Sequence, residues 1–261
     1  MSSRRIDSFR REVWDYWKKS GRHHLAWRKT RDPYKILVSE VMLQQTQVPR
    51  VEGKYREFLK AFPNVRTLEK APLAEVLKVW SGLGYNRRAK FLHDAAKEVV
   101  LKHAGNMPRD IDALLALPGV GEYTAKAVRV FAFNEPEILI ETNIRTVFFH
   151  YFYSSVLQKS RIRDDQIVPL ARAAAKKQDP REWHLALMDY GTHLKASGVR
   201  VNARSKHYTK QSKFEGSLRQ VRGVILKAHT GKESLKMVRE TYKDAYDKAF
   251  ASLLKDGLIS V

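Results

Sequence analysis

Apolar residues recur at helical spacing along most of the chain. Near the N-terminus, Ile6, Phe9, Val13 and Trp17 follow one another at steps of three and four residues, which places them on one face of a helix. The same spacing predicts further helices, first up to about residue 132 and then over 141–153, 163–177 and 181–195. No alternating apolar and polar run is long enough to establish a sheet. We therefore predict an all-α domain over residues 1–195.

Proline marks the start of the second predicted helix. Asp32 is a residue type that caps helix N-termini, and Pro33 fits the first helical turn, where no backbone N–H is needed. The apolar pattern that follows predicts a helix running to about Pro49.

The composition changes after residue 195. Residues 195–223 contain eight Lys or Arg and a single acid, Glu215, so we predict a basic linker or arm over 196–215. The remaining residues, 216–261, predict a small module with helices beginning near 216, 232 and 241, then a turn and a short strand. This order is typical of a winged-helix module, although a plain helical extension would give almost the same pattern.

The charge of the chain indicates its partner. With 49 Lys and Arg against 28 Asp and Glu, the formal net charge is +21, and a polyanion is the usual reason for such an excess. An anionic membrane surface is the alternative, but the sequence has no apolar run of 18–20 residues, signal peptide or lipidation motif. Nucleic acid is therefore favoured, and we expect a cytoplasmic, nucleoid-associated protein.

The absence of cysteine limits the cofactors. A chain with no Cys forms no disulfide, no thiolate metal site and no cysteine-ligated iron–sulfur cluster. The nine histidines show no metal-binding pattern either. We expect a protein without a cofactor and without a side-chain metal site.

Two glycines form a hairpin before a predicted helix, in Leu117-Pro118-Gly119-Val120-Gly121. Glycine permits the tight turn, and the free N–H groups of the following helix make an anion site. Such a hairpin holds a DNA phosphate through backbone amides, in some proteins with a cation bound by backbone oxygens, here those of Leu117 and Val120. An ordinary helix–helix turn is the alternative. The net charge favours the phosphate site.

Several segments occur together in the order found in one known family. They are Trp27 to Tyr34, Ser39 to Thr46 followed by Gln47-Val48, Gly82 to Tyr85, Leu117 to Thr124, and Ala186 to Asp189. Over residues 20–195 the chain resembles the helix-hairpin-helix (HhH-GPD) DNA glycosylases, most closely the MutY-type adenine glycosylases. The resemblance implies two helical lobes with a base pocket between them. It extends to archaeal thymine mismatch glycosylases.

The resemblance also implies a reaction, in which a base is flipped out of DNA and its N-glycosidic bond is hydrolysed. The leaving base has to be protonated and the positive charge on the sugar stabilised, which two carboxylates can do. Glu40 stands at the position of the family's catalytic acid, and its apolar neighbours predict partial burial. Glu141 replaces the family's essential aspartate, with Asn143 two residues on. The longer arm of Glu141 leaves open a repositioned, altered or inactive site.

Tyr123 implies a monofunctional enzyme. It stands where bifunctional relatives carry a lysine that forms a Schiff base with the sugar, which tyrosine cannot do. Lys126, one turn further on, is expected to touch phosphate, with a substitute amine as the alternative.

Further site residues follow from the same resemblance and from the charge pattern. We expect Gln45 to act as the wedge beside the flipped base, with Gln44, Tyr85 and Asn86 around it. The residues expected to contact DNA are Leu117, Gly119, Val120, Gly121, Thr124, Lys126, Arg87, Arg88, Arg204, Lys206 and Lys210.

The chain departs from the MutY pattern at three points, namely Glu141, the missing cluster cysteines and a C-terminus that ends before an 8-oxoguanine-reading domain could follow. We expect a monomeric, monofunctional DNA glycosylase acting on double-stranded DNA that removes a mispaired base, with adenine opposite guanine or 8-oxoguanine favoured. One alternative is a thymine or uracil glycosylase acting opposite guanine, which the missing reader domain, Tyr123 and Asn86 favour. The other is a protein that binds mismatched or distorted DNA without cutting, which Glu141 in place of aspartate favours.

Overall fold

The computed structural model describes residues 3–153, 162–201, 205, 213–229, 231 and 234–259. Within these ranges the regular structure is helical, apart from one isolated bridge between Ile162 and Ser205. The predicted all-α class is confirmed. Among these residues no helix is both long and apolar enough to cross a membrane.

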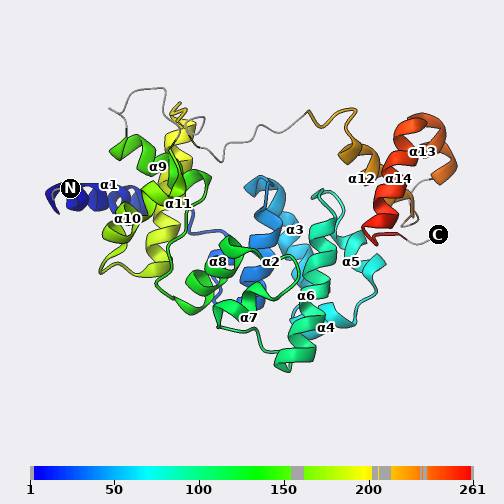
Figure 1. Ribbon diagram of the computed structural model, residues 1–261, viewed down its shortest axis with the longest axis horizontal. Coiled ribbons are helices and arrows are strands. Elements are labelled where there is room, and N and C mark those ends of the chain that lie inside the picture. The colour runs from blue at the N-terminus through cyan, green and yellow to red at the C-terminus, as the bar shows by residue number, and fades with distance from the viewer. Residues whose placement is uncertain are drawn as a thin grey trace. The chain divides into compact units, whose positions relative to one another are not determined.

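The chain folds into two compact units. Unit 1 consists of Met1–Arg31 and Ala125–Lys210, and unit 2 of Asp32–Thr124 and Gln211–Val261. The N-terminal helix α1 of Figure 1 thus shares a unit with α9, α10 and α11, whereas the red C-terminal helices belong with the cyan ones. The domain boundaries predicted at residues 195 and 215 stay a prediction.

Unit 1 is built around an aromatic core. Its helices are α1 (Ser3–Ser20), the short 3-10 helix η1 (Ala26–Arg28), most of α8 (Glu122–Phe133), α9 (Thr142–Phe152), α10 (Asp164–Ala175) and α11 (Pro180–Ala196). Helix α11 packs against both α1 and α9 (Figure 1). Phe9, Phe148 and Trp183 are fully buried, and the ring of Phe9 lies 5.4 Å from Phe148 and 6.0 Å from Trp183 between centroids. These tilted and edge-on ring contacts stabilise the unit beyond simple area burial.

Unit 2 contains α2 (Pro33–Leu43), α3 (Val48–Ala61), α4 (Val65–Lys70), α5 (Leu73–Trp80), α6 (Arg87–His103) and α7 (Ile111–Leu115). Asp32 caps α2 as predicted, since its carboxylate accepts hydrogen bonds from the N–H groups of Tyr34 and Lys35. Met42, Phe58 and Trp80 are fully buried in the core of these helices.

The second helix ends earlier than its sequence pattern predicts. Helix α2 stops at Leu43 rather than near Pro49, and α3 begins at Val48. Gln45 takes a left-handed backbone conformation, with φ of +54°, which no α-helix can accommodate. Pro49 fits the first turn of α3, where its missing N–H costs nothing. Residues 44–47 therefore form a loop, which we call the wedge loop.

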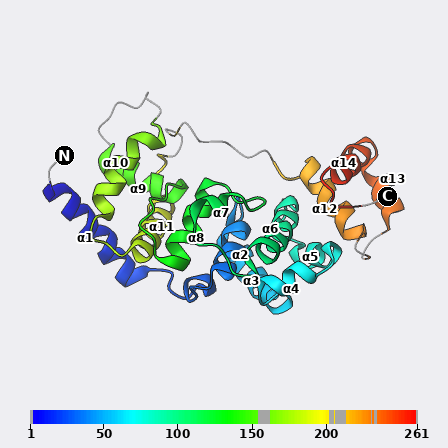
Figure 2. The same cartoon turned by 60° about the horizontal axis from the view of Figure 1, so that its bottom comes forward.

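The C-terminal residues of unit 2 form three helices, as predicted. They are α12 (Leu218–His229), α13 (Leu235–Tyr242) and α14 (Asp244–Lys255), and they pack on one another in both views (Figures 1 and 2). The short strand expected after them is absent among the described residues, which end at Ile259. Gly257 turns the chain with φ of +62°, and the N–H of Leu258 caps α14 by donating to the carbonyl of Leu253.

A glycine determines how closely α11 approaches the start of α9. A Cβ atom added at Gly191 would lie 2.2 Å from the carbonyl oxygen of Asn143 and 2.8 Å from its Cβ. Both neighbours are close to the backbone and cannot swing away, so only glycine fits here.

We expect Gly191→Ala to lower the free energy of unfolding by about 1–3 kcal/mol, because the added methyl group pushes the start of α9 away from α11. Urea denaturation measures this. Gly53→Ala on α3 is the matched control, since its Cβ would meet nothing within 4 Å. That change should leave stability unchanged or raise it by up to about 1 kcal/mol. Equal stability of the two variants would contradict the close packing at Gly191.

Candidate active site

Glu141 caps the N-terminus of α9. Its Oε1 atom accepts hydrogen bonds from the N–H groups of Asn143, at 2.8 Å, and Ile144, at 2.9 Å. The side-chain Nδ2 of Asn143 donates to the other carboxylate oxygen at 3.2 Å. Three N–H groups therefore fix the carboxylate in one position, at a helix end that favours negative charge.

The surroundings of Glu141 make its charge costly. Burial raises the pKa of Glu141 above the ordinary 4.5, and the two backbone N–H groups and the charges of Lys195 and Arg145 only partly offset this effect. A carboxylate that has lost most of its water attracts a nearby positive charge more strongly than an exposed one. The replacement of aspartate therefore keeps a strong local negative charge at this point.

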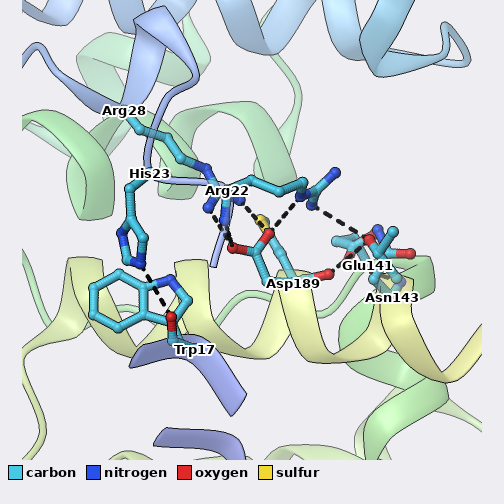
Figure 3. A network of polar contacts seen from close by, with 9 residues as sticks. Trp17, Arg22, His23, Arg28, Glu141, Asn143 and Asp189 are labelled. Carbon is cyan, nitrogen blue, oxygen red and sulfur yellow. Dashed lines mark hydrogen bonds and ion pairs between the residues drawn. The ribbon is translucent and has the colours of Figure 1, made fainter. Parts of the chain in front are cut away.

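Asn143 contributes an unsatisfied acceptor beside the carboxylate. Its Oδ1 atom is buried and has no hydrogen-bond partner among the described residues. Figure 3 shows Asn143 next to Glu141 at the start of α9. Buried polar atoms are rarely left unpaired, and those that are often belong to binding sites. The pair can thus offer a fixed anion and a free acceptor to a substrate.

A buried aspartate holds the N-terminal segment onto α11. Asp189 is 2 % exposed and accepts both guanidinium Nη groups of Arg28, at 2.6 and 2.7 Å, and the Nε of Arg22 at 2.6 Å (Figure 3). Burial by itself would raise the pKa of Asp189, but the hydrogen bonds and charge of Arg28 and the charge of Arg22 outweigh it, so the pKa is lowered. The aspartate is therefore ionised, and it connects residues far apart in the sequence.

In unit 2, Glu40 lies near the end of α2 and is half-buried. The predicted partial burial is found, since Ser39, Val41 and Met42 beside it are all buried. This placement keeps the carboxyl group on a rigid helix and partly away from water.

Arg88 occupies a different place from the one predicted. It was expected to contact phosphate, but it is only 9 % exposed and its guanidinium points into unit 2. There it donates to the carbonyls of Val41, at 2.9 Å, and Met42, at 3.0 Å, at the end of α2. Burial lowers the pKa of Arg88 to about 10, which still leaves it cationic at neutral pH. Its donors are used within the protein, so we assign it a positioning role.

Arg88 joins the wedge loop to a second loop, residues 82–86. It donates to Thr46 Oγ1 in the first loop and to the carbonyl of Gly84 in the second, each at 3.1 Å. Each loop contains a non-glycine residue in the left-handed region, Gln45 with φ of +54° and Tyr85 with φ of +49°. Such strain persists only where the surroundings enforce it, and it is common at functional sites. The two residues expected at the wedge and the base pocket are therefore held by one guanidinium.

The glycine hairpin lies between α7 and α8. Gly119 has φ of +74°, and a Cβ there would come within 2.5 Å of Phe91, so this glycine is required. The N–H of Val120 donates to the carbonyl of Leu117 at 3.1 Å, which closes the turn. The wedge loop reaches the first turn of α8, which follows this hairpin, because Gln44 Nε2 donates to Thr124 Oγ1 at 3.3 Å. Phosphate binding here, and a cation on the backbone of Leu117 and Val120, stay predictions.

The other residues expected to contact DNA differ in how exposed they are. Gly121 and Arg87 are exposed, whereas Asn86, Tyr123 and Lys126 are half-buried. Arg204, Lys206 and Lys210 lie outside the described residues. Among the described residues no group of three or more His, Asp or Glu is arranged to hold a metal ion.

Comparison with known proteins settles the family. A family model described as "HhH-GPD superfamily base excision DNA repair protein" matches residues 38–169, which is half of the chain. The chain belongs to this superfamily. The expected helix-hairpin-helix (HhH-GPD) fold is thereby confirmed.

Relatives of two specificities resemble this HhH-GPD protein. An adenine DNA glycosylase of Mycolicibacterium smegmatis is 33% identical over 93% of this chain and 90% of its own length. One from Buchnera aphidicola subsp. Baizongia pistaciae is 38% identical, but the chain spans only 43% of its length. A thymine/uracil-DNA glycosylase of Pyrobaculum aerophilum is 32% identical over 70% of this chain and 80% of its own length.

A solved structure shares the fold. A thermostable thymine-DNA glycosylase superposes with a TM-score of 0.63 and 29% identity, covering 72% of this chain and 86% of that chain.

Sequence reasoning missed one part of this HhH-GPD site. The segment Ala186 to Asp189 served only as a family signature, and the role of its aspartate went unnoticed. An acid within an apolar helix face was the available signal, because a buried carboxylate needs a cationic partner.

We expect Asp189→Asn to destabilise the protein by about 3–5 kcal/mol at pH 7, because Arg28 stays buried without its counter-charge. The lowered pKa sets the pH dependence. The contribution of Asp189 is complete above its ordinary pKa of 3.8 and is lost as the pH falls through the lowered value. Urea denaturation measures both effects, with the exposed Asp15→Asn as control. A loss below about 1 kcal/mol would show that this ion pair has no structural role.

Proposed function

We propose that this chain is a monofunctional DNA glycosylase that removes mispaired adenine. The observation that carries the proposal is the buried carboxylate of Glu141, held by three N–H groups beside the free acceptor of Asn143. The longer side chain in place of aspartate raised the question of an inactive site. The fixed position of the Glu141 carboxylate and its strong local negative charge favour an active site, because an oxocarbenium-like sugar needs a preorganised negative charge.

The roles of the two carboxyl groups follow from the bond that breaks. As the N-glycosidic bond opens, its electron pair goes to the base, which takes a proton from the carboxylic acid of Glu40. Glu141 stabilises the cationic sugar that remains. Water then adds at the sugar's anomeric carbon and its proton returns to Glu40, which leaves an abasic site. Tyr123 offers no amine for a Schiff base, so the DNA strand stays intact.

Adenine is favoured because an adenine glycosylase matches nearly the whole chain. Thymine or uracil opposite guanine is the second candidate, since a relative and a solved structure with those specificities also match. We further infer that the protein acts as a monomer on the nucleoid.

Single-turnover base release from a duplex panel tests the proposal. The panel holds A opposite G, A opposite 8-oxoguanine, T opposite G, U opposite G, and matched duplexes. We expect adenine release that is scored as strand breaks only after alkali. Glu40→Gln should lower the rate at least about 100-fold, because the leaving base loses its proton donor. Glu57→Gln, an exposed glutamate on α3, is the control.

Each outcome of the panel has a meaning. Release of thymine or uracil alone would replace adenine by the second candidate. Strand cleavage without alkali would refute the monofunctional assignment. Tight binding without any release would leave a protein that recognises mismatches and does not cut them.

Glu141→Gln separates catalysis from helix capping. The amide oxygen can still cap α9 and no buried charge remains, so stability at pH 7 should stay the same or rise, while base release should fall at least about 100-fold. In the wild type, release should decline as the pH is lowered through the raised pKa of Glu141, above 4.5. Calorimetry and a pH–rate profile measure these effects. A lower Tm with an unchanged rate would reduce Glu141 to a capping residue.

A further inference from the structure

A pocket of about 340 Å³ lies in unit 1, where η1 and the residues after it meet the start of α11. Neither Glu141 nor Asn143 lines it. Figure 3 shows two lining residues, Trp17 and His23, on one side of Asp189, and Glu141 and Asn143 on the other side. Pockets of this size are typical of ligand sites. The pocket is therefore a second concave site of unit 1, outside the Glu141 site.

Cations dominate the lining of this pocket. Against one described acid, Glu182, it has four Lys or Arg residues, namely Arg28, Lys29, Arg31 and Arg181. The charge of Arg28 is compensated by Asp189, to which both of its Nη groups donate. The other three cations form no ion pair with a carboxylate of the described residues. An anion is the partner that such a cluster lacks.

Arg181 is the buried member of this cluster. It lies in the first turn of α11 and is 6 % exposed. Its Nη2 group donates to the carbonyls of Arg28 and Thr30, each at 2.8 Å, which fixes the guanidinium. Burial and then the nearby charge of Arg31 lower the pKa of Arg181, and two acidic neighbours only partly oppose this. A bound anion would stabilise its charged form.

Three lining side chains have buried N–H groups without an acceptor. Among the described residues, Trp17 Nε1, Arg28 Nε and Arg181 Nη1 have no hydrogen-bond partner. Buried polar groups are nearly always paired, and a group of unpaired donors in one place indicates a missing ligand, ion or water. A ligand with several acceptor oxygens can satisfy such donors together.

An apolar wall completes the pocket. Leu185 and the indole of Trp17 contribute to it, and the ring of His23 lies edge-on to Trp17 with 4.5 Å between ring centres. His23 Nε2 lies 3.0 Å from the carbonyl oxygen of Trp17, which holds the imidazole in place (Figure 3). Such a mixed lining suits a phosphate ester, because its anionic oxygens can face the cations and its carbon part the wall.

We propose that this pocket is a phosphate-binding site. Arg181 and Arg31 bind the phosphate oxygens, since a guanidinium matches phosphate geometry, and Lys29 adds a charge at the rim. The phosphate belongs to a small ester in solution or to the backbone of DNA, which offer the pocket the same chemistry. The inference goes beyond the proposed function and does not depend on base release.

Inorganic phosphate is the first probe, titrated calorimetrically into the whole chain at constant ionic strength. We expect one saturable site with a Kd of about 1 mM or tighter. The rim variant, Lys29→Gln with Arg31→Gln, changes two exposed residues and should fold normally. It should bind phosphate at least about tenfold more weakly, because two charged hydrogen-bond donors are lost.

A second pair of cations provides the matched control. Arg172 and Lys176, at the end of α10, are exposed and do not line the pocket. Arg172→Gln with Lys176→Gln removes the same charge from unit 1 and should keep the phosphate Kd within about twofold of the wild type. Thermal unfolding shows whether both double variants are folded.

A DNA-binding measurement distinguishes the two sources of the phosphate. Anisotropy gives the Kd for a fluorescent matched duplex in chloride and in phosphate buffers of equal ionic strength. If DNA fills the pocket, phosphate competes with the duplex, and the rim variant binds DNA more weakly and with a lower salt slope than the control variant. If a small ester fills it, phosphate does not compete and the two variants bind DNA equally.

Equal phosphate affinity of the rim variant and the control variant would overturn the site, as would a wild type without saturable binding. Neither measurement scores base release. A failure of the proposed catalysis in the duplex panel would therefore leave this result intact, and a failure here would leave the proposed catalysis intact.

Discussion

A charge that leaves water has to be compensated inside the protein, and each unit of this chain is organised around such a charge. In unit 1 the buried Asp189 draws Arg22 and Arg28 onto α11, and so fixes the segment after α1. In unit 2 the buried Arg88 donates to no carboxylate of the described residues. It uses backbone carbonyls instead, at the end of α2 and in the loop at Gly84. These carbonyls lie at helix ends and turns, where no helix ladder satisfies them.

The buried charge of Arg88 also determines the shape of the loops that carry candidate site residues. Arg88 holds two loops in which Gln45 and Tyr85 have positive φ, a conformation that costs free energy for residues other than glycine. Glu141 is a half-buried charge at the start of α9, and loss of water around its carboxylate raises its pKa despite the N–H groups that it accepts from. A carboxylate whose lost hydration is only partly replaced by hydrogen bonds attracts a nearby cation strongly. A positively charged sugar is the group that a glycosylase has to stabilise, so the imperfect balance is consistent with catalysis.

The C-terminal helices give the chain one wall of a pocket of about 540 Å³ beside these loops. The contact of Arg219 with Tyr85 spans 134 residues, and it connects the basic end of the chain to a loop of the family core. The cations behind the net charge of +21 therefore do more than attract DNA in general, because at least one of them, Arg219, contacts the loop of Tyr85.

The sequence alone determined what depends on neighbouring residues. Helical spacing gave the helices, Asp32 and Pro33 the start of α2, and the glycines the hairpin before α8, because each rests on local backbone geometry. The family motifs then named Glu40, Glu141 and Tyr123. Packing decided where α2 ends and that Arg88 points inward. The apolar spacing of α2 continues through residues 44–47, so the sequence pattern alone does not mark the loop there. Contacts such as that of Arg22 with Asp189, 167 residues apart, exist only once the chain has folded, because no spacing rule relates residues on different helices.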